Sequence, residues 1–269
     1  MKKKITLILA VALIVLTSCM LLIGCTPSKP SDYMLKWNDS KNKSITLVGY
    51  EDYVNVETSE GVWEKKEGRT TTEISYIHSG DTYMVKSVEI TNIKKDGKDS
   101  NTDTITPTEA IIYELKDGKY NVYYYELVWE KESASSDKIV KKGKWTAYQA
   151  SVEDVEAGND EIGEFSYIKG MFERQVESNK ALAETFDEKY TKDGGKYVAN
   201  DKINDCTQTL KVKSGELVGE LTDSEGKVVM GSRLDLNEKI TISSGAKDAL
   251  KEYLNPDAYT HLRAHATVQ

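Results

Sequence analysis

The chain has 269 residues, of which 39% are hydrophobic, and a formal net charge of −8. This hydrophobic fraction is low for a globular protein but too high for wholesale disorder, and 18 glycines with 4 prolines exclude a collagen-like or proline-rich chain. The lysines are scattered among a larger number of acids, which argues against nucleic-acid binding. The aromatic residues are 16 Tyr and 4 Trp but only 3 Phe, a bias that favours half-buried sheet surfaces.

Residues 1–24 have the organisation of a secretory signal peptide. Lysines at positions 2–4 precede an apolar run over residues 5–23, and Gly24 and Cys25 follow. The end of this segment resembles the lipobox of bacterial lipoproteins, in which the signal is removed and the cysteine becomes a diacylated N-terminus. The resemblance implies lipidation of Cys25 and attachment to the outer face of the cell membrane, where two acyl chains hold a protein stably.

Two alternatives to this processing are open. A second lipobox match ends at Cys19, but a cut there would leave the apolar residues 20–23 ahead of a polar tether, so Cys25 is favoured. An uncleaved membrane anchor is the other alternative, because the apolar run is close to the ~20 residues that span a bilayer. Removal of residues 1–24 takes away three lysines and no acid, so the net charge moves from −8 to −11. The excess of lysine over arginine favours a Gram-positive host.

Beyond the signal peptide, the hydrophobic pattern divides the chain into a tether, one domain and a tail. Residues 25–43 are polar and turn-rich and are predicted to form a lipidated flexible tether. Residues 44–245 are predicted to form a single α+β domain, and residues 246–269 a short helix, stopped by Asn255-Pro256, with a frayed tail. Short strands are expected in the first half of the domain, over 44–50, 53–58, 61–66, 69–78 and 82–94.

The second half of the domain changes period. Apolar residues recur at spacings of three and four from Phe165 to Phe186, which predicts an amphipathic helix, or two shorter helices divided at Gly170. A meander of short strands follows, ending with a strand over 239–242. The order of strands, helix and strands shows no βαβ alternation. The predicted fold class is therefore α+β, with an antiparallel sheet and helices covering one face.

The clearest hairpin lies between Ala110 and Trp129. Its turn, 116–119, places Asp-Gly where a tight hairpin needs positive φ. In the second strand Val122 and Tyr124 point to one face, whereas Tyr123, Tyr125, Leu127 and Trp129 point to the other. A strand exposed on one side should alternate with polar residues, so this strand is covered on both sides or one of its faces meets a ligand.

The order and spacing of hairpin turns and aromatic strands over residues 44–243 resemble those of a known protein family. The resemblance is carried by Ile111-Ile112, Lys116–Tyr120, Lys144-Trp145, Phe186, Tyr190, Gly195, Tyr197, residues 210–217, Gly226-Lys227 and Ile240–Ile242. This arrangement resembles the LolA/LppX/LprG-like half-barrel lipoproteins. The resemblance implies an incomplete antiparallel barrel closed by helices around an apolar cavity for acyl chains. The helix that this family has before its first strand is not predicted here.

The sequence contains no motif for catalysis or cofactor binding. Gly-x-Ser-x-Gly, Walker, Gly-x-Gly-x-x-Gly and Cys-x-x-Cys patterns are absent, and only 3 His are present for proton transfer near neutral pH. His261 and His265 have the spacing of two metal ligands on a helix but are predicted to lie in a solvated tail, and residues 153–161 are read as a solvated helix entry rather than a calcium loop. We predict no enzyme activity, no metal and no cofactor, and a structural role for Cys206.

Two functions follow from the aromatic strand. In the first, the protein binds a lipid or other apolar ligand in a half-barrel cavity, and the candidate lining residues are Tyr123, Tyr125, Trp129, Phe165, Phe172 and Phe186. In the alternative, it is a surface module whose exposed Tyr and Trp side chains bind a protein or glycan and which has no cavity. A purely structural interpretation of this pattern is also open. In it, the same aromatic residues pack as ordinary core beneath the predicted helix.

Overall fold

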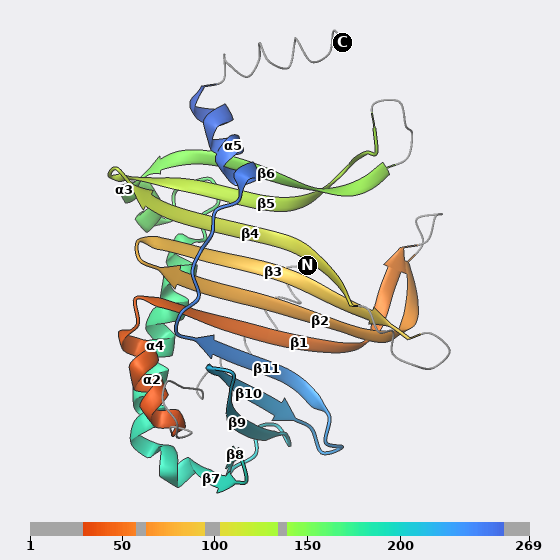
Figure 1. Cartoon of the computed structure of the whole chain (residues 1–269), viewed down its shortest axis with the longest axis vertical. Helices are drawn as coiled ribbons and strands as arrows, with labels where there is room; N and C mark the ends of the chain where they lie inside the picture. The colour runs from red at the N-terminus through yellow and green to blue at the C-terminus, as the bar shows by residue number, and fades with distance from the viewer. Residues whose placement is uncertain (1–28, 58–62, 95–102, 134–138, 256–269) are drawn as a thin grey trace.

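The computed structural model describes residues 29–57, 63–94, 103–133 and 139–255, where eleven strands form one open antiparallel sheet. The strand order is β6-β5-β4-β3-β2-β1-β11-β10-β9-β8-β7, so β6 and β7 are the edges (Figure 1). The strands are β1 (Asn42–Glu57), β2 (Trp63–Ser79), β3 (Thr82–Ile93), β4 (Thr104–Lys116), β5 (Lys119–Lys131), β6 (Ile139–Ser151), β7 (Tyr190–Asp193), β8 (Lys196–Ala199), β9 (Thr207–Lys213), β10 (Glu216–Thr222) and β11 (Val228–Asp235).

The sheet consists of two meanders that meet where β1 pairs with β11. The first meander ends at the edge strand β6, and the second begins at the opposite edge, β7. The described helices are α2 (Pro30–Asp39), α3 (Val152–Ala157), α4 (Phe165–Lys189) and α5 (Ser244–Leu254). The connection between the two edges is made by α3 and α4, and α4, with 25 residues, is about 37 Å long. The prediction of an α+β fold with an antiparallel sheet is confirmed.

Local turn chemistry sets the tight hairpins. Asp117 and Gly118 have φ values of 51° and 75°, and Ser214 and Gly215 have 55° and 84°. Positive φ at both central residues matches the right-handed twist of the flanking strands, and Gly, Asp and Asn tolerate it best. The predicted turn between Lys116 and Lys119 is thereby confirmed.

The two faces of the sheet carry different helices. Successive residues of a strand point to opposite faces. Val122 packs in one apolar cluster with residues of α2 and α4, whereas its neighbour Tyr123 packs in a second cluster with Ala246 of α5. We call these the inner and the outer face. Residues of α2, α3 and α4 pack in the inner-face cluster, whereas α5 lies against the outer face, so the described helices are not all on one face.

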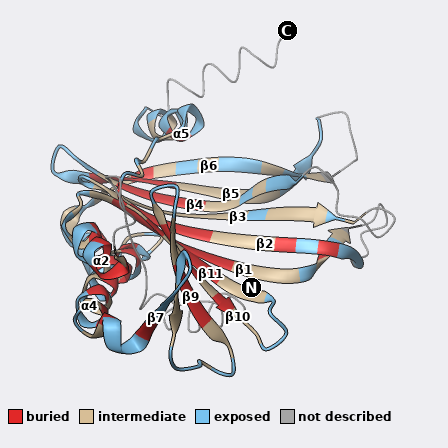
Figure 2. Ribbon diagram, turned by 60° about the horizontal axis from the view of Figure 1, so that its bottom comes forward, coloured by how far each residue is buried: buried red, intermediate tan, exposed pale blue. Residues whose placement is uncertain are grey.

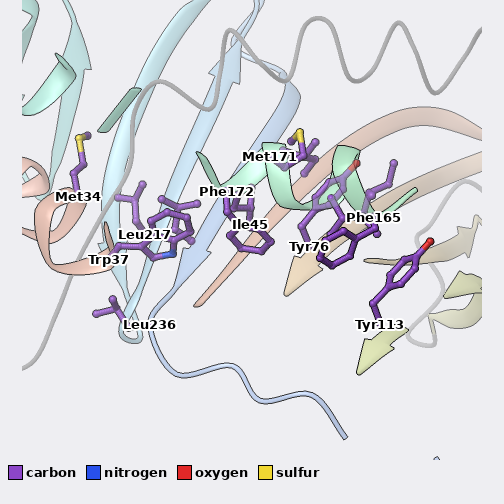
Figure 3. Close-up of a cluster of buried hydrophobic side chains, with 14 of the residues drawn as sticks. Met34, Trp37, Ile45, Tyr76, Tyr113, Phe165, Met171, Phe172, Leu217 and Leu236 are labelled. Atoms are coloured by element: carbon purple, nitrogen blue, oxygen red, sulfur yellow. The ribbon is translucent and has the colours of Figure 1, made fainter. Parts of the chain in front are cut away.

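Burial is concentrated on the inner face. Figure 2 shows buried residues on the sides of α2 and α4 that face the sheet and on the adjoining ends of the central strands. Figure 3 shows Trp37, Phe165 and Phe172 of the two helices among side chains of the sheet such as Ile45 and Tyr76. The far ends of β3 to β6 are intermediate or exposed in Figure 2, so the helices cover only part of the inner face.

The predicted tether is wrong for residues 30–39, which form α2. Pro30 occupies the first turn of this helix, and Tyr33, Met34 and Trp37 are fully buried. Asn38 joins α2 to α4, donating from Nδ2 to the Val176 carbonyl at 3.2 Å. The packed structure therefore begins with α2 and not at residue 44, and a helix does precede the first strand. The signal peptide and Cys25 lie outside the described residues.

Two predicted boundaries are also corrected, and one of the two alternatives for the helix after Phe165 is confirmed. Residues 44–57 form one long strand with an irregularity between Glu51 and Tyr53, not two short ones. The helix after Phe165 is continuous through Gly170. Residues 239–242 form no strand; Ile240 and Ile242 instead pack against the outer face and lead into α5. The helix predicted from residue 246 to 254 is confirmed, although Ala246 is fully buried and belongs to the packed structure.

In the described part of the chain, no helix is long and apolar enough to cross a membrane. The tail from residue 256 onward, with His261 and His265, lies outside that part.

Candidate functional site

The inner face beneath α4 is filled by side chains of the protein itself. The Phe165 ring lies 5.2 Å from the Tyr113 ring and 5.0 Å from the Tyr120 ring, measured between centroids. Phe172 stacks on Trp37 at 6.2 Å. The three phenylalanine rings of α4, at Phe165, Phe172 and Phe186, are 2%, 4% and 1% exposed. These residues therefore pack as an aromatic core between helix and sheet.

A polar anchor fixes the start of α4 above the sheet. The hydroxyls of Tyr113 and Tyr148 donate to Asp160 Oδ2 at 3.2 and 2.7 Å. The same hydroxyls accept from the backbone N–H groups of Glu164 and Ile162, at 3.3 and 3.2 Å. Burial, and then the Asp160 carboxylate, raises the pKa of both tyrosines. Residues 153–161 were predicted to be a solvated helix entry, but Asp160 within them is bound to two tyrosines of the sheet.

Aromatic side chains of β5 and β6 line the outer face in a second group. The Tyr125 and Trp145 rings lie 5.2 Å apart, and a methyl group at position 143 would come within 2.0 Å of the Tyr125 hydroxyl oxygen. Glycine at 143 therefore leaves room for the Tyr125 ring to lie across β6. Lys141 Nζ lies 4.8 Å from the centre of the Trp129 ring. We call Tyr125, Leu127, Trp129, Lys141 and Trp145 the outer-face strip.

Exposure distinguishes the end of this strip from ordinary core. The Trp129 side chain is 52% exposed, and Ile105 at the adjoining end of β4 is 65% exposed. Tyr123, in contrast, is 2% exposed beneath α5, and its hydroxyl donates to Glu114 Oε2 at 2.9 Å. The strip is thus anchored at the α5 end and open to solvent at the other.

The six candidate lining residues do not surround one cavity. Phe165, Phe172 and Phe186 lie on the inner face, whereas Tyr123, Tyr125 and Trp129 lie on the outer face or its exposed end. The expectation that these Tyr and Trp side chains pack beneath the helix is wrong. The strand is buried on both faces only over residues 120–123, and its residues in the inner-face core are Tyr120, Val122 and Tyr124.

A charged hollow on the outer face of β1, β2 and β9 to β11 was not foreseen from the sequence. It has a volume of about 270 Å³ and lies between the Arg233–Glu73 ion pair, at 2.6 Å, and the Lys211–Glu220 ion pair, at 2.7 Å. Burial raises the pKa of Glu216, which also lines it. The alternation of acids over residues 216–220 and lysines over 211–213 is the signal that could have revealed this face.

A second hollow, of about 320 Å³, lies at Glu156, Phe165, Ser166, Lys169 and Glu173. Neither hollow lies between the aromatic hairpin, residues 110–130, and the inner side of α4. Within the described residues, no three His, Cys, Asp or Glu side chains gather in a way that could hold a metal ion.

Comparison with known proteins adds no assignment to this geometry: no protein-family model matches the chain, and no curated protein matches it in sequence.

Proposed function

We propose that the chain is an extracytoplasmic, lipid-anchored protein that binds a protein partner through the outer-face strip. The observation that carries the proposal is the half-exposed Trp129, with Lys141 Nζ over its ring on the paired strands β5 and β6. Trp is enriched among the residues that dominate binding energy, and an aromatic anchor on a strand loses little conformational entropy when a partner covers it. In this proposal the protein is attached to the membrane by the N-terminal diacylglyceryl cysteine at position 25.

The surroundings of Trp129 favour a protein over a glycan. Leu127 lies on the same face of β5, and Ile105 is exposed at the end of β4. Lys131 and Lys141 flank the indole. Protein interfaces combine an apolar centre with such a charged rim. The expected partner therefore presents an apolar surface bordered by acidic groups.

Trp129→Ala is expected to weaken partner binding by about tenfold or more, since aromatic anchors are worth about 2 kcal/mol or more. Binding is measured by a photo-reactive amino acid at Leu127, irradiated in cells of the source organism, followed by detection of the adduct. The matched control is Leu35→Ala on α2, where the side chain is 47% exposed and far from the strip in sequence.

The same experiment separates the alternatives. An adduct that resists protease but is cleaved by glycosidase would identify a glycan. Equal adduct yields from the Trp129 and Leu35 variants would contradict a role for the strip. Because Trp129 is half-exposed, its replacement is expected to change the free energy of unfolding by only about 0.5 kcal/mol, so loss of the adduct would not reflect unfolding.

The second candidate function is the binding of an apolar ligand at the inner face. It corresponds to the half-barrel shape that the resemblance to LolA-like proteins implies. It is favoured by the continuous apolar inner surface of the sheet, which runs through Ile45, Ile74, Tyr76, Ile111 and Val122. The helices close over this surface with large rings, and an acyl chain would occupy comparable volume if α4 moved away. Such a ligand would displace Phe165 and Phe172 rather than enter an existing cavity.

Two measurements test the anchor and this second candidate. Cys25→Ser is expected to abolish incorporation of labelled fatty acid, because it removes the thiol that carries the acyl chains. The chain from Lys29 onward, which lacks both the signal peptide and Cys25, is purified without detergent, extracted with solvent and examined by mass spectrometry. A stoichiometric acyl compound would support the inner-face ligand, and its absence after incubation with phospholipid vesicles would exclude it. Fatty-acid labelling that persists in Cys25→Ser would contradict the Cys25 anchor.

A further inference from the structure

The charged hollow on the outer face is built around a glycine. Gly231 of β11 pairs with Val48 of β1 on one side and with Glu220 of β10 on the other. A methyl group at position 231 would lie 3.4 Å from Val48 Cβ and 3.5 Å from the Tyr50 hydroxyl oxygen. Glycine therefore leaves the space of about 270 Å³ open above the strands, and Val48 and Val218 give it an apolar floor. A glycine within a strand often marks a place where a ligand approaches the backbone.

Two ion pairs form the rims of this hollow. Nη2 of Arg233 contacts Glu73 Oε2 at 2.6 Å, which joins β11 to β2 across β1 (Figure 1). Nζ of Lys211 contacts Glu220 Oε1 at 2.7 Å, which joins β9 to β10. The four side chains are between 22% and 34% exposed. Each pair retains hydrogen-bonding capacity, because a guanidinium has five N–H donors, an ammonium three, and a carboxylate two acceptor oxygens.

Tyr50 and Glu216 add a hydroxyl and a carboxylate to the hollow. Burial raises the pKa of Tyr50, and the charges of Arg233 and Glu220 also act on it, so its hydroxyl lies near both ion pairs. Glu216 lines the hollow from β10, and its carboxylate has no hydrogen bond or ion pair with any residue that the structure describes. The hollow therefore presents donors on its basic side chains and an acceptor on Glu216 that the protein itself does not use.

The balance of charge around the hollow favours a neutral ligand. Three basic and three acidic side chains line it: Arg233, Lys211, Lys213, Glu73, Glu216 and Glu220. A charged ligand that replaced one member of an ion pair would leave the other member partly buried without its partner, which is costly. A hydroxyl group both donates and accepts, so two neighbouring hydroxyls can bind an ion pair without breaking it.

We propose that the hollow binds a neutral saccharide, either as a free sugar or as the end of a glycan chain. The sugar hydroxyls accept hydrogen bonds from Arg233 and Lys211. They donate to Glu216 and Glu220, and the C–H side of the ring lies on the apolar floor. The volume equals roughly nine water molecules at about 30 Å³ each, which suits a small saccharide. This inference goes beyond the proposed partner binding and does not depend on it, because the outer-face strip lies on other strands.

Saturation-transfer NMR tests the proposal on the complete chain, purified in a detergent whose headgroup contains no sugar. The probes are glucose, galactose, mannose and N-acetylglucosamine, each as the monosaccharide and as a linear trisaccharide. Acetate and glycine serve as charged probes. We expect saturation of at least one neutral sugar and of neither charged probe. Binding of the monosaccharide would identify a free sugar, whereas binding of the trisaccharide alone would identify a glycan chain.

Lys211→Met removes one rim of the hollow, and Lys86→Met is its matched control. Lys86 also forms an ion pair on the outer face, with Glu238 at 3.0 Å, but it does not line the hollow. The Lys86 and Lys211 side chains are 35% and 34% exposed, and each substitution leaves one glutamate without its partner. We expect Lys211→Met to raise the Kd for the sugar about tenfold or more and Lys86→Met to leave it within about twofold.

Gly231→Ala provides a second measurement from the floor of the hollow. The added methyl group occupies part of the space that the sugar needs, and the Kd is expected to rise about tenfold. Gly231 does not have a positive φ, so alanine suits the strand, and the thermal unfolding midpoint is not expected to fall. Weaker sugar binding in this variant would therefore not reflect unfolding.

Three results would overturn the proposal. The first is no saturation of any neutral sugar at about 10 mM. The second is an equal Kd for the Lys211 and Lys86 variants, which would place the sugar elsewhere. The third is saturation of acetate or glycine alone, which would assign the hollow to a charged ligand. Trp129→Ala is expected to leave sugar binding unchanged, so this proposal and the partner-binding proposal can fail separately.

Discussion

A chain that begins at Ser44 is expected to lose its fold, whereas one that begins at Lys29 keeps it. Deleting α2 removes Tyr33, Met34 and Trp37, each 0% exposed. Full burial of a large apolar side chain contributes about 1.5–3 kcal/mol, so the three together contribute roughly 5–9 kcal/mol, close to the total stability of many domains. Circular dichroism and urea unfolding of the two chains measure the difference.

A milder change separates packing from chain length. Trp37→Ala is expected to lower the free energy of unfolding by about 3–5 kcal/mol, because it opens a cavity beside Phe172 and removes the donor to the Ser44 carbonyl. Leu35→Ala, in the same helix but 47% exposed, is expected to change it by about 0.5 kcal/mol or less. Cooperative unfolding of the chain from Ser44 at parent stability would show that residues 25–43 are a tether after all.

Local chemistry made the sheet predictable. Asp117-Gly118 specifies its hairpin through positive φ, and the apolar spacing from Phe165 to Phe186 specifies α4. Each of these signals is contained in one continuous stretch of sequence. The α2 helix was missed because only three of its ten residues, Tyr33, Met34 and Trp37, carry the apolar stripe. Their partners on α4, such as Phe172, lie far along the sequence.

The face that α4 covers could not be predicted from β5 alone. Both faces of that strand are apolar, so its pattern indicates two coverings but not which element provides each. The choice follows from the long crossing between the two edge strands, which carries α4 over the face of Tyr120 and Val122. The segment before α5 then covers Tyr123 from the other side. The candidate site therefore depended on a chain path that no local signal specifies.

The tyrosine-rich core is expected to make the fold unusually sensitive to alkaline pH. Burial raises the pKa of Tyr120 to about 12 and raises the pKa values of five further tyrosines: Tyr33, Tyr76, Tyr113, Tyr123 and Tyr148. In the unfolded chain each would ionise near pH 10. Above that pH the folded state binds more protons than the unfolded state, so stability is intact below pH 10 and falls as the pH rises.

The loss is about 1.4 kcal/mol per pH unit for each tyrosine, or roughly 8 kcal/mol per unit for the group, which predicts cooperative unfolding between about pH 11 and pH 12. Circular dichroism and tyrosinate absorbance at 295 nm should change together. Tyr120→Phe removes one of these ionisations while keeping the ring and should move the midpoint upward by about 0.2 pH unit. Tyr253→Phe, at a side chain that is 50% exposed, should not move it. Ionisation of all tyrosines near pH 10 with an unchanged circular dichroism spectrum would contradict the closed aromatic core between α4 and the sheet, and would favour an inner face that opens to solvent and ligands.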